Sequence, residues 1–449
     1  MRERDLPVGR RALLGAGLLA GAGAALAGCT AEGSGDRPAA GDAGRAGGSA
    51  PPFDPASWES VRAQFALDPG HAQFAAYVLA AHPAPVRRAV EEHRRALDTD
   101  TEAYLINGPD REEPVREAAA GYLGGRADDV ALTDSTTMGL GLLYGGLRLL
   151  PGQDVLTTEH DFYATHESLR LLAERTGAKV RRARLYDEPS TASADAIVSR
   201  LKEALGPRTR VVAVTWVHSG TGVRLPVREI ARMLAEANAS RDEQDRALLC
   251  VDGVHGFGAL ADDVGDLDCD FLVSGTHKWL YGPRGTGIVW GRAWDALRPV
   301  IPSFSGPAFS GWIDGYAPSG PGGVLGTPGG YHSFEHRWAL SEAFAFHRAI
   351  GKDRVAARIA EQATRLKEGL SALRNVRLIT PVDAGLSAGI VCCAITGVDA
   401  GLATLRLRER HRIVASVTPY RERYLRLGPG IVTTPEEVDR VVKAVATLE

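Results

Sequence analysis

Two short apolar runs near the middle of the chain end in side chains that can do chemistry. The run Ala247–Val251 is followed by Asp252, and the run Phe271–Val273 is followed by a polar group that contains Lys278. Short apolar runs bounded by Gly and polar residues are typical of buried parallel strands, whose carboxyl ends carry the ligands of α/β proteins. The sequence therefore predicts a carboxylate and a lysine side by side.

A buried carboxylate beside a lysine has a specific use in enzymes that carry pyridoxal phosphate. The carboxylate keeps the pyridine nitrogen protonated, so that the ring accepts electrons, and the lysine holds the aldehyde as a Schiff base until the substrate displaces it. The alternative is that Asp252 caps a helix and Lys278 is a solvated surface charge. Trp279 and a Gly/Pro-rich loop follow the lysine, which is a poor setting for a solvated charge and favours the catalytic interpretation.

Small hydroxyl side chains follow an earlier strand pattern. The run Val130–Leu132 leads into Ser135, Thr136 and Thr137, after which apolar residues recur at helical spacing. This order can bind a phosphate group, because free backbone N–H groups and the positive end of the helix dipole face the anion. The alternative is a simple helix cap, since Ser and Thr favour that position in any helix.

These candidate residues need a scaffold that brings strand ends together. From residue 154 onward, strand patterns alternate with helix patterns as far as the lysine, which predicts an α/β fold with a mainly parallel sheet sandwiched by helices. Residues at the carboxyl ends of its strands should then meet in one site. They are Ser135 to Thr137, His160, His218, Ser219, Asp252, His255, Thr276, His277 and Lys278.

A change of pattern near residue 310 predicts a second part of the chain. The stretch Gly306–Tyr331 is dense in Gly, Pro and Ser, which indicates a long functional loop, and Phe334–Ile350 has the pattern of one helix. Strand and helix patterns from Val376 onward predict a compact α+β unit. We therefore expect a large cofactor-binding domain over residues 53–310, and a loop with a smaller C-terminal domain over residues 311–449.

The N-terminus has the features of an export signal. Paired Arg10 and Arg11 precede an apolar run that ends in Leu26–Cys29. The arginines resemble a Tat signal, and the last four residues resemble a lipobox, in which the cysteine is acylated. We therefore expect a signal peptide over residues 1–29, a flexible linker over residues 30–52, and an exported, extracytoplasmic lipoprotein held at the membrane only by lipid on Cys29. The alternative is an ordinary secretory signal with a chance cysteine.

Composition argues against several other functions. The 449 residues carry a formal net charge of -3 with both signs interspersed, and so there is no basic surface for nucleic acid. The five cysteines are too few for a disulfide framework, and no Cys/His spacing indicates a metal site. We therefore expect a small-molecule ligand, with neither a nucleic acid nor a metal ion.

With these residues in place, the chain resembles the class V aminotransferase superfamily of fold-type I pyridoxal phosphate enzymes. The superfamily includes cysteine desulfurases, selenocysteine lyases and isopenicillin N epimerase-like proteins. The resemblance extends from about Trp58 to the C-terminus, and its most specific part is V-D-G-V-H followed by S-G-T-H-K-W. It implies that Lys278 forms the Schiff base with the cofactor and that Asp252 contacts the pyridine nitrogen.

The same resemblance implies roles for other residues. His160, in T-T-E-H-D, would stack on the cofactor ring, and Arg426, in Y-L-R-L-G, would bind the substrate carboxylate through its planar fork. His255 stands where many relatives have a glutamine near the cofactor oxygen, and Ser219 stands where desulfurases have an asparagine. The residues implied on the phosphate side are Ser135, Thr136, Thr137, Thr276 and His277.

The resemblance also implies a homodimer in which each subunit completes the phosphate site of the other. The loop that reaches across is either Gly326-Thr327-Pro328 or Gly329-Gly330-Tyr331, which makes Thr327 a further cofactor candidate. The motif G-G-Y-H-S-F-E-H-R-W is closer to the epimerase-like branch than to the desulfurases.

The absence of one thiol separates the possible reactions. Desulfurases need a nucleophilic cysteine on a mobile C-terminal loop, whereas the corresponding stretch Arg410–Arg426 has none. Cys392 and Cys393 lie earlier, in an apolar strand pattern where a thiol is buried and unreactive. Selenocysteine lyase or another C–S lyase activity does not require that thiol and stays an alternative.

We therefore expect chemistry at the α-carbon of an amino acid or a peptide-like substrate, by an epimerase or an aminotransferase. Lys278 would act as the general base once it is released from the cofactor. The second acid that an epimerase needs is open among Tyr281, His218 and Tyr331. A hypothesis of another class is a lipoprotein that binds such a ligand on the same fold without catalysis.

Overall fold

The central feature of the computed structural model is a seven-stranded sheet with the order β2-β8-β7-β6-β5-β3-β4. Strand β8 is antiparallel to both of its neighbours, and the remaining pairs in the sheet are parallel. The predicted mainly parallel α/β sheet is thus confirmed. Its strands are β2 (Val130–Thr133), β3 (Asp154–Thr158), β4 (Lys179–Ala183), β5 (Thr209–Thr215), β6 (Leu248–Asp252), β7 (Phe271–Gly275) and β8 (Gly287–Gly291).

The structure describes residues 51–108 and 110–448. The expected signal peptide, the lipidation site Cys29 and nearly all of the expected linker lie outside these ranges. Within the described ranges, no helix is both long enough and apolar enough to span a bilayer.

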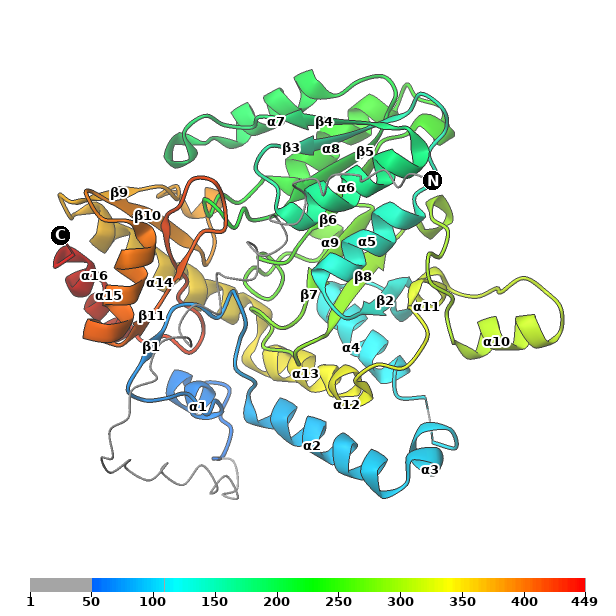
Figure 1. Cartoon of the computed structure of the whole chain (residues 1–449), viewed down its shortest axis with the longest axis horizontal. Helices are drawn as coiled ribbons and strands as arrows, with labels where there is room; N and C mark the ends of the chain where they lie inside the picture. Colours follow the sequence, from blue (N-terminus) through cyan, green and yellow to red (C-terminus); the bar gives the residue numbers. More distant parts are fainter. Residues whose placement is uncertain (1–50, 109, 449) are drawn as a thin grey trace, which may run out of the picture. The chain divides into compact units, whose positions relative to one another are not determined.

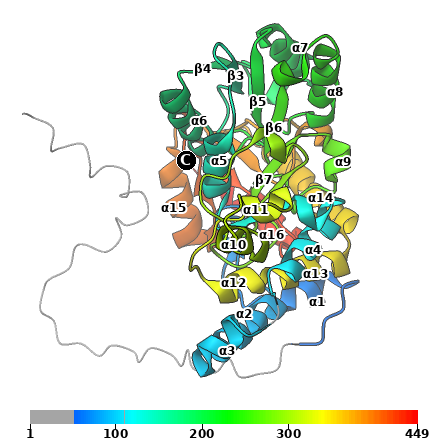
Figure 2. The same ribbon diagram turned by 90° about the vertical axis from the view of Figure 1, so that its right-hand side faces the viewer.

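Helices cover both faces of this sheet because its strands are apolar on both sides. Along β5, Val211 and Ala213 pack on one face, against a cluster that includes residues of α5 and α6, while Val212 and Val214 pack on the other. Figure 2 shows the strands between α5 and α6 on one side and α7 and α8 on the other. The covering helices are α4 (Glu113–Leu123), α5 (Thr136–Gly146), α6 (Tyr163–Thr176), α7 (Ala194–Ala204), α8 (Val227–Asn238), the short α9 (Val264–Leu267) and α13 (Leu340–Ile350).

The C-terminal part contains a second, antiparallel sheet with its own helices. A four-stranded antiparallel sheet has the order β12-β13-β10-β9 and packs with three helices (Figure 1). A short N-terminal strand, β1 (Ala72–Gln73), pairs in parallel with β11 (Ile413–Val414), so this early segment packs with the C-terminal core. The other elements are β9 (Val376–Leu378), β10 (Val391–Ile395), β12 (Ser416–Val417), β13 (Leu425–Leu427), α14 (Lys352–Ser371), α15 (Ala400–His411) and α16 (Pro435–Ala446).

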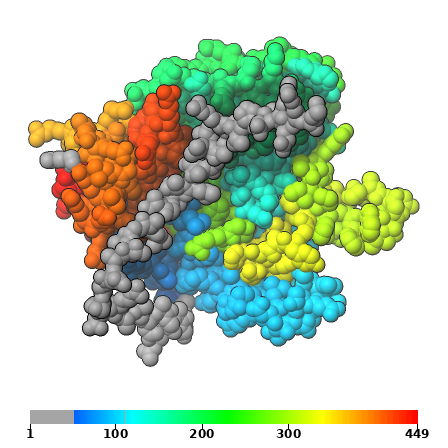
Figure 3. Space-filling model, in the orientation of Figure 1, coloured from blue at the N-terminus to red at the C-terminus, as the bar shows by residue number. Residues whose placement is uncertain are grey.

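The stretch Gly306–Tyr331 is not the continuous loop that its composition predicts. It contains α10 (Gly306–Ile313), with a proline in its first turn, and α11 (Gly322–Gly326). A Cβ atom at Gly323 would lie 2.5 Å from the backbone of Val130, so the glycines allow α11 to pack directly on β2. The space-filling view shows the α10 segment standing out from the rest of the chain (Figure 3).

Other boundaries also differ from the predicted ones. The helix expected over Phe334–Ile350 is divided at Ala339 into α12 (Phe334–Trp338) and α13. The remaining helices are α1 (Trp58–Ala63), α2 (Ala84–Thr99) and α3 (Thr101–Leu105). The predicted domain boundary at residues 310 and 311 stays a prediction.

Candidate active site

Asp252 is the last residue of β6, and Lys278 follows the adjacent parallel strand β7. In the β6–β7 register Asp252 pairs with Val273, and Lys278 follows the end of β7 by three residues. The Asp252 side chain is buried and accepts a hydrogen bond from the backbone N–H of Val254 at 3.1 Å. The loop that carries the lysine passes close to Gly258, which has a φ of 81° and where a Cβ would lie 2.7 Å from the backbone nitrogen of Leu280.

Burial shifts the pKa values of Asp252 and Lys278 in opposite directions, because it favours the neutral form of each group. Loss of hydration raises the pKa of the Asp252 carboxyl, and the charge of Lys278 partly opposes that rise. Burial lowers the pKa of the Lys278 ammonium, Asp252 opposes this effect, and the positive charge of Arg426 adds to it. The lysine is thereby biased toward its neutral, nucleophilic form, as an amine that must attack an aldehyde requires.

His255 contacts the lysine directly. Its Nε2 atom lies 3.3 Å from Lys278 Nζ, and its side chain is buried. Burial, followed by the charge of Lys278, holds the pKa of the imidazole well below its usual range, so the ring is neutral. Among the described residues, its buried Nδ1 has no hydrogen-bond partner. An unpartnered polar atom here fits a cofactor with polar substituents better than it fits an apolar core.

The predicted stacking residue His160 already has an aromatic neighbour. Its ring stacks on Tyr186 with centroids 3.8 Å apart, and its Nε2 accepts a hydrogen bond from the backbone N–H of Leu185 at 3.2 Å. Only the opposite face of the imidazole could therefore receive a cofactor ring. Burial lowers the pKa of His160 to about 3, so the stacking ring is neutral.

Tyr186 was missed by the sequence analysis. Its hydroxyl lies 2.8 Å from His218 Nδ1 and 3.0 Å from Thr221 Oγ1. Burial lowers the pKa of His218 to about 3, which makes this candidate for the second acid a neutral imidazole. The position of Tyr186 three residues beyond the end of β4 is the only signal that could have identified it.

The predicted phosphate loop packs against the strand that leads to the lysine. Ser135 Oγ accepts a hydrogen bond from Met138 N at 3.1 Å and so caps α5, as the alternative interpretation expected. Thr136 Oγ1 accepts from Gly275 N at 2.7 Å, which ties the loop to β7. Thr137 is exposed and leaves a hydroxyl beside the N-terminus of α5 for an anion.

Two other predicted phosphate contacts already serve the fold. The Thr276 hydroxyl lies 2.5 Å from the Thr286 hydroxyl, and Thr327 donates to Gly323 O at 2.9 Å while it accepts from Leu132 N at 3.1 Å. The half-buried His277 has its Nδ1 atom 3.5 Å from the backbone oxygen of Thr286. Their contacts with a cofactor stay predictions.

Arg426 reaches the end of β5 from the antiparallel sheet. Its Nε donates to Ser416 Oγ at 3.0 Å, and its NH1 donates to Ser219 O at 3.1 Å. The guanidinium lies 4.7 Å from the ring centroid of Tyr77, whose hydroxyl donates to Arg426 O at 2.6 Å. A buried guanidinium held in this way is suited to a carboxylate.

Tyr420 adds a hydroxyl beside this arginine. Its oxygen lies 2.6 Å from Ser219 Oγ, and a Cβ at Gly220 would lie 2.9 Å from its ring. Burial raises the pKa of Tyr420 to about 12. No pattern in the amino-acid sequence predicted either Tyr420 or, earlier in the chain, Tyr77 as a site residue.

The two tyrosines proposed as second acids occupy contrasting environments. Tyr281 is buried, has a φ of 58° and follows the lysine by three residues, and burial raises its pKa above the usual range. Tyr331 is 86% exposed. Neither environment by itself assigns a role in proton transfer.

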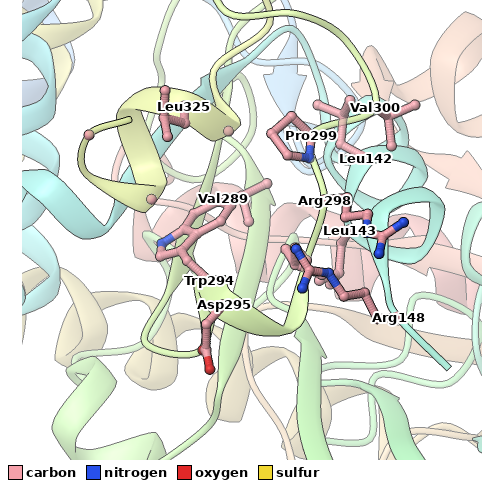
Figure 4. A pocket seen from close by; sticks show the side chains of 14 residues that line it. Leu142, Leu143, Arg148, Val289, Trp294, Asp295, Arg298, Pro299, Val300 and Leu325 are labelled. Atoms are coloured by element: carbon pink, nitrogen blue, oxygen red, sulfur yellow. The ribbon is translucent and has the colours of Figure 1, made fainter. Parts of the chain in front are cut away.

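A separate cavity lies away from these residues. It has a volume of about 410 Å³ and is lined by Leu142 and Leu143 of α5, Val289 of β8, Trp294 and Leu325 among others (Figure 4). None of the predicted site residues lines it. The chemistry-bearing side chains therefore gather elsewhere, at the carboxyl ends of β5, β6 and β7.

Comparison with known proteins agrees with this geometry. The chain is 28% identical over 410 residues to isopenicillin N epimerase of Amycolatopsis lactamdurans, with 87% of this chain and 98% of the relative covered. It is 26% identical over 360 residues to a cysteine desulfurase of Pectobacterium carotovorum subsp. carotovorum, with 74% and 80% covered.

Solved structures share the fold. A C-DES mutant with glycine covalently linked to its pyridoxal phosphate cofactor has a TM-score of 0.76 at 20% identity, with 86% of this chain and 99% of that chain covered. The apo cysteine desulfurase of Thermococcus onnurineus has a TM-score of 0.70 at 19% identity, with 86% and 96% covered. The aminotransferase class-V family model matches residues 110–440. The chain therefore belongs to the class-V aminotransferase family, and it is a pyridoxal phosphate-dependent enzyme.

Proposed function

We propose that this enzyme acts at the α-carbon of an amino acid or an amino-acid-containing substrate, as an isopenicillin N epimerase-like epimerase or as an aminotransferase. One observation carries the proposal. Lys278, whose pKa burial lowers, lies in the same buried site as Asp252, and it is close enough to Arg426 for the positive charge of that arginine to lower the pKa further. Such a site can bind the carboxylate of an amino acid and remove the proton next to it.

Pyridoxal phosphate supplies an electron sink for the electron pair that the broken Cα–H bond leaves behind. Asp252 would hold a proton on the pyridine nitrogen, because a buried carboxylate stabilises a positive charge beside it. His255, neutral and with an unpartnered Nδ1, would contact a polar substituent of the cofactor.

Different residues of the chain would bind the substrate carboxylate and accept the α-proton. Arg426 binds and orients the carboxylate, and its rigid contacts with Ser219 and Ser416 fix that orientation before the substrate arrives. Lys278, as a neutral amine, accepts the α-proton. The half-buried Tyr420 ring, whose hydroxyl contacts Ser219, would limit the access of water to the carboxylate side.

The cysteines of the described part argue against persulfide chemistry. Cys250, Cys269, Cys392 and Cys393 are all buried. Burial raises the pKa of Cys392 and Cys393 to about 12, so neither thiol is ionised near neutral pH. A nucleophile that accepts sulfur needs an exposed thiolate.

The reaction is tested by following the substrate α-proton. Purified holoenzyme is incubated with a panel of amino acids and short peptides in D₂O, and deuterium at Cα, keto acid and released sulfide are measured. Exchange without keto acid identifies an epimerase, and keto acid formed without sulfide identifies an aminotransferase. Sulfide release, which β-elimination couples to keto acid formation, would refute the proposal in favour of a C–S lyase.

We further propose a homodimer. The apolar surface of the α10 segment supports it, since between Pro299 and Phe334 the only Asp, Glu, Lys or Arg residue is Asp314. Large side chains there are exposed, among them Phe304, Phe309, Trp312, Ile313 and Tyr316. Light scattering should report a dimer, and Trp312→Asp should weaken it while Leu405→Asp, at an exposed site on α15, should not. A monomeric holoenzyme would refute this proposal.

We also propose that the enzyme is exported and carries lipid on Cys29. The support is the lipobox-like sequence Leu26–Cys29 behind the paired arginines. Fractionation of cells should place the enzyme in the membrane fraction, with labelled palmitate incorporated, and Cys29→Ala should release it. Unchanged membrane association of that variant would contradict a lipid anchor.

A further inference from the structure

An arginine far along the chain, Arg337, binds Asp134, the residue that precedes the predicted phosphate loop. Arg337 lies in α12, is only 4% exposed, and donates from NH2 to Asp134 Oδ1 at 3.0 Å. Its NH1 donates to Glu112 Oε1, also at 3.0 Å. Asp134 directly precedes Ser135, the N-cap of α5, and Glu112 is the N-cap of α4. The guanidinium therefore joins three segments at one end of the sheet.

A second contact ties the same stretch of chain to the same strand. Thr327 Oγ1 accepts a hydrogen bond from the backbone N–H of Leu132, near the end of β2. The stretch from Thr327 to Arg337 is thus attached at two points, to β2 itself and to the turn that leads from β2 into α5. This double attachment limits the positions that the phosphate loop can adopt.

The charge of Asp134 explains why an arginine is needed there. An unpaired carboxylate beside the N-terminus of α5 would repel a phosphate group and weaken its binding. The Asp134 side chain keeps 40% of its exposure, whereas that of Arg337 keeps 5%, so the cation approaches from the protein interior. Glu112, the other carboxylate that contacts Arg337, is also paired with Arg116 at 3.4 Å.

We infer that Arg337 is a positioning residue for the cofactor phosphate. It neutralises Asp134 and holds the Ser135–Thr137 turn so that the free N–H groups of α5 face the anion. Arg337 acts through Asp134 and does not itself bind the cofactor. The inference rests on the assignment of Ser135–Thr137 to the phosphate group, and it is independent of which reaction the enzyme catalyses.

The test compares two cofactor forms that differ only in the phosphate. The affinities of the apoenzyme for pyridoxal phosphate and for pyridoxal are measured by absorbance titration. Arg337→Met should weaken binding of pyridoxal phosphate by about tenfold or more, since an uncompensated like charge then faces the anion. Binding of pyridoxal should change by less than about twofold. Arg365→Met, which breaks the exposed pair with Asp439, is the matched control and should change neither affinity.

A double-mutant cycle separates charge from mere packing. Asp134→Asn alone should leave the affinity for pyridoxal phosphate equal or higher, and it should restore most of the loss when combined with Arg337→Met. An equal loss for both cofactor forms, no loss at all, or a double variant as weak as Arg337→Met would overturn the inference. If Arg337→Met does not fold, as judged by thermal unfolding of the apoenzyme, Arg337→Lys replaces it and should give a smaller loss of the same kind.

A separate variant tests the loop assignment itself. Thr137→Ala should weaken pyridoxal phosphate more than pyridoxal, and inorganic phosphate should compete with cofactor binding. If neither effect occurs, the loop is wrongly assigned and the inference fails with it. If both occur while Arg337→Met has no selective effect, only the role of Arg337 is refuted.

Discussion

Replacing Arg426 by leucine should remove the selectivity of the enzyme for a carboxylate. Of the five N–H donors of a guanidinium, one goes to Ser416 Oγ and one to Ser219 O, which leaves donors on NH1 and NH2 for a bidentate contact. Each hydrogen bond to a charged group is worth about 1.5–3 kcal/mol. Loss of two such bonds should therefore weaken amino-acid binding by about 3–6 kcal/mol, or about two to four orders of magnitude.

The assay is a spectral titration of the holoenzyme with an amino acid and with the corresponding amino-acid amide. In Arg426→Leu the affinity for the amino acid should fall, while the affinity for the uncharged amide should change little. Arg365→Leu on the exposed face of α14 is the matched control. The charge of Arg426 lowers the pKa of Lys278, so the pH profile of amino-acid binding should also move to higher pH in the variant. Equal losses for both ligands would refute the role of Arg426 as the carboxylate anchor.

Three further predictions concern Lys278, the buried His347, and Gly258, which lies against the loop that carries the lysine. Lys278→Ala should lose the absorbance band of the Schiff base, which lies near about 410–430 nm and responds to borohydride in the wild type, and a retained band would exclude this lysine. Burial lowers the pKa of His347 to about 3. Below about pH 6.5 the unfolded chain therefore binds a proton that the native chain does not, and the free energy of unfolding decreases as the pH is lowered. His347→Leu should therefore reduce the slope of the unfolding free energy between pH 5 and 6 by about 1 kcal/mol per pH unit in urea titrations, whereas a slope as steep as that of the wild type would contradict this. Gly258→Ala should weaken cofactor binding at least about tenfold, because the positive φ of 81° and a Cβ 2.8 Å from Trp279 C force the lysine loop to move, and unchanged binding in a cofactor titration would refute that coupling.

The matches to known proteins leave the choice of reaction to experiment. The chain resembles an isopenicillin N epimerase over nearly the whole of that protein, and it resembles cysteine desulfurases almost as well. The buried thiols of the described residues argue against a persulfide intermediate. The α-proton experiment and the amide comparison test two independent parts of the proposed function.

The sequence by itself determined the pair at the centre of the site. Apolar strand runs are a local property of the chain, and in a parallel sheet strands that end in polar residues present them at the same edge. For this reason the amino-acid pattern alone predicts that Asp252 and Lys278 lie side by side. The sheet class and the helical coverage follow from the same alternation, and the structure confirms them.

Only the tertiary structure decided which distant side chains surround that pair. Tyr186 on His160, Tyr420 on Ser219 and Arg337 on Asp134 are contacts between segments whose separation along the chain no periodic pattern encodes. Within the Gly/Pro-rich stretch, α11 likewise depends on its packing on β2, which its glycines allow. Local patterns depend on short-range conformational preferences, whereas these contacts depend on how the sheets and their connections pack.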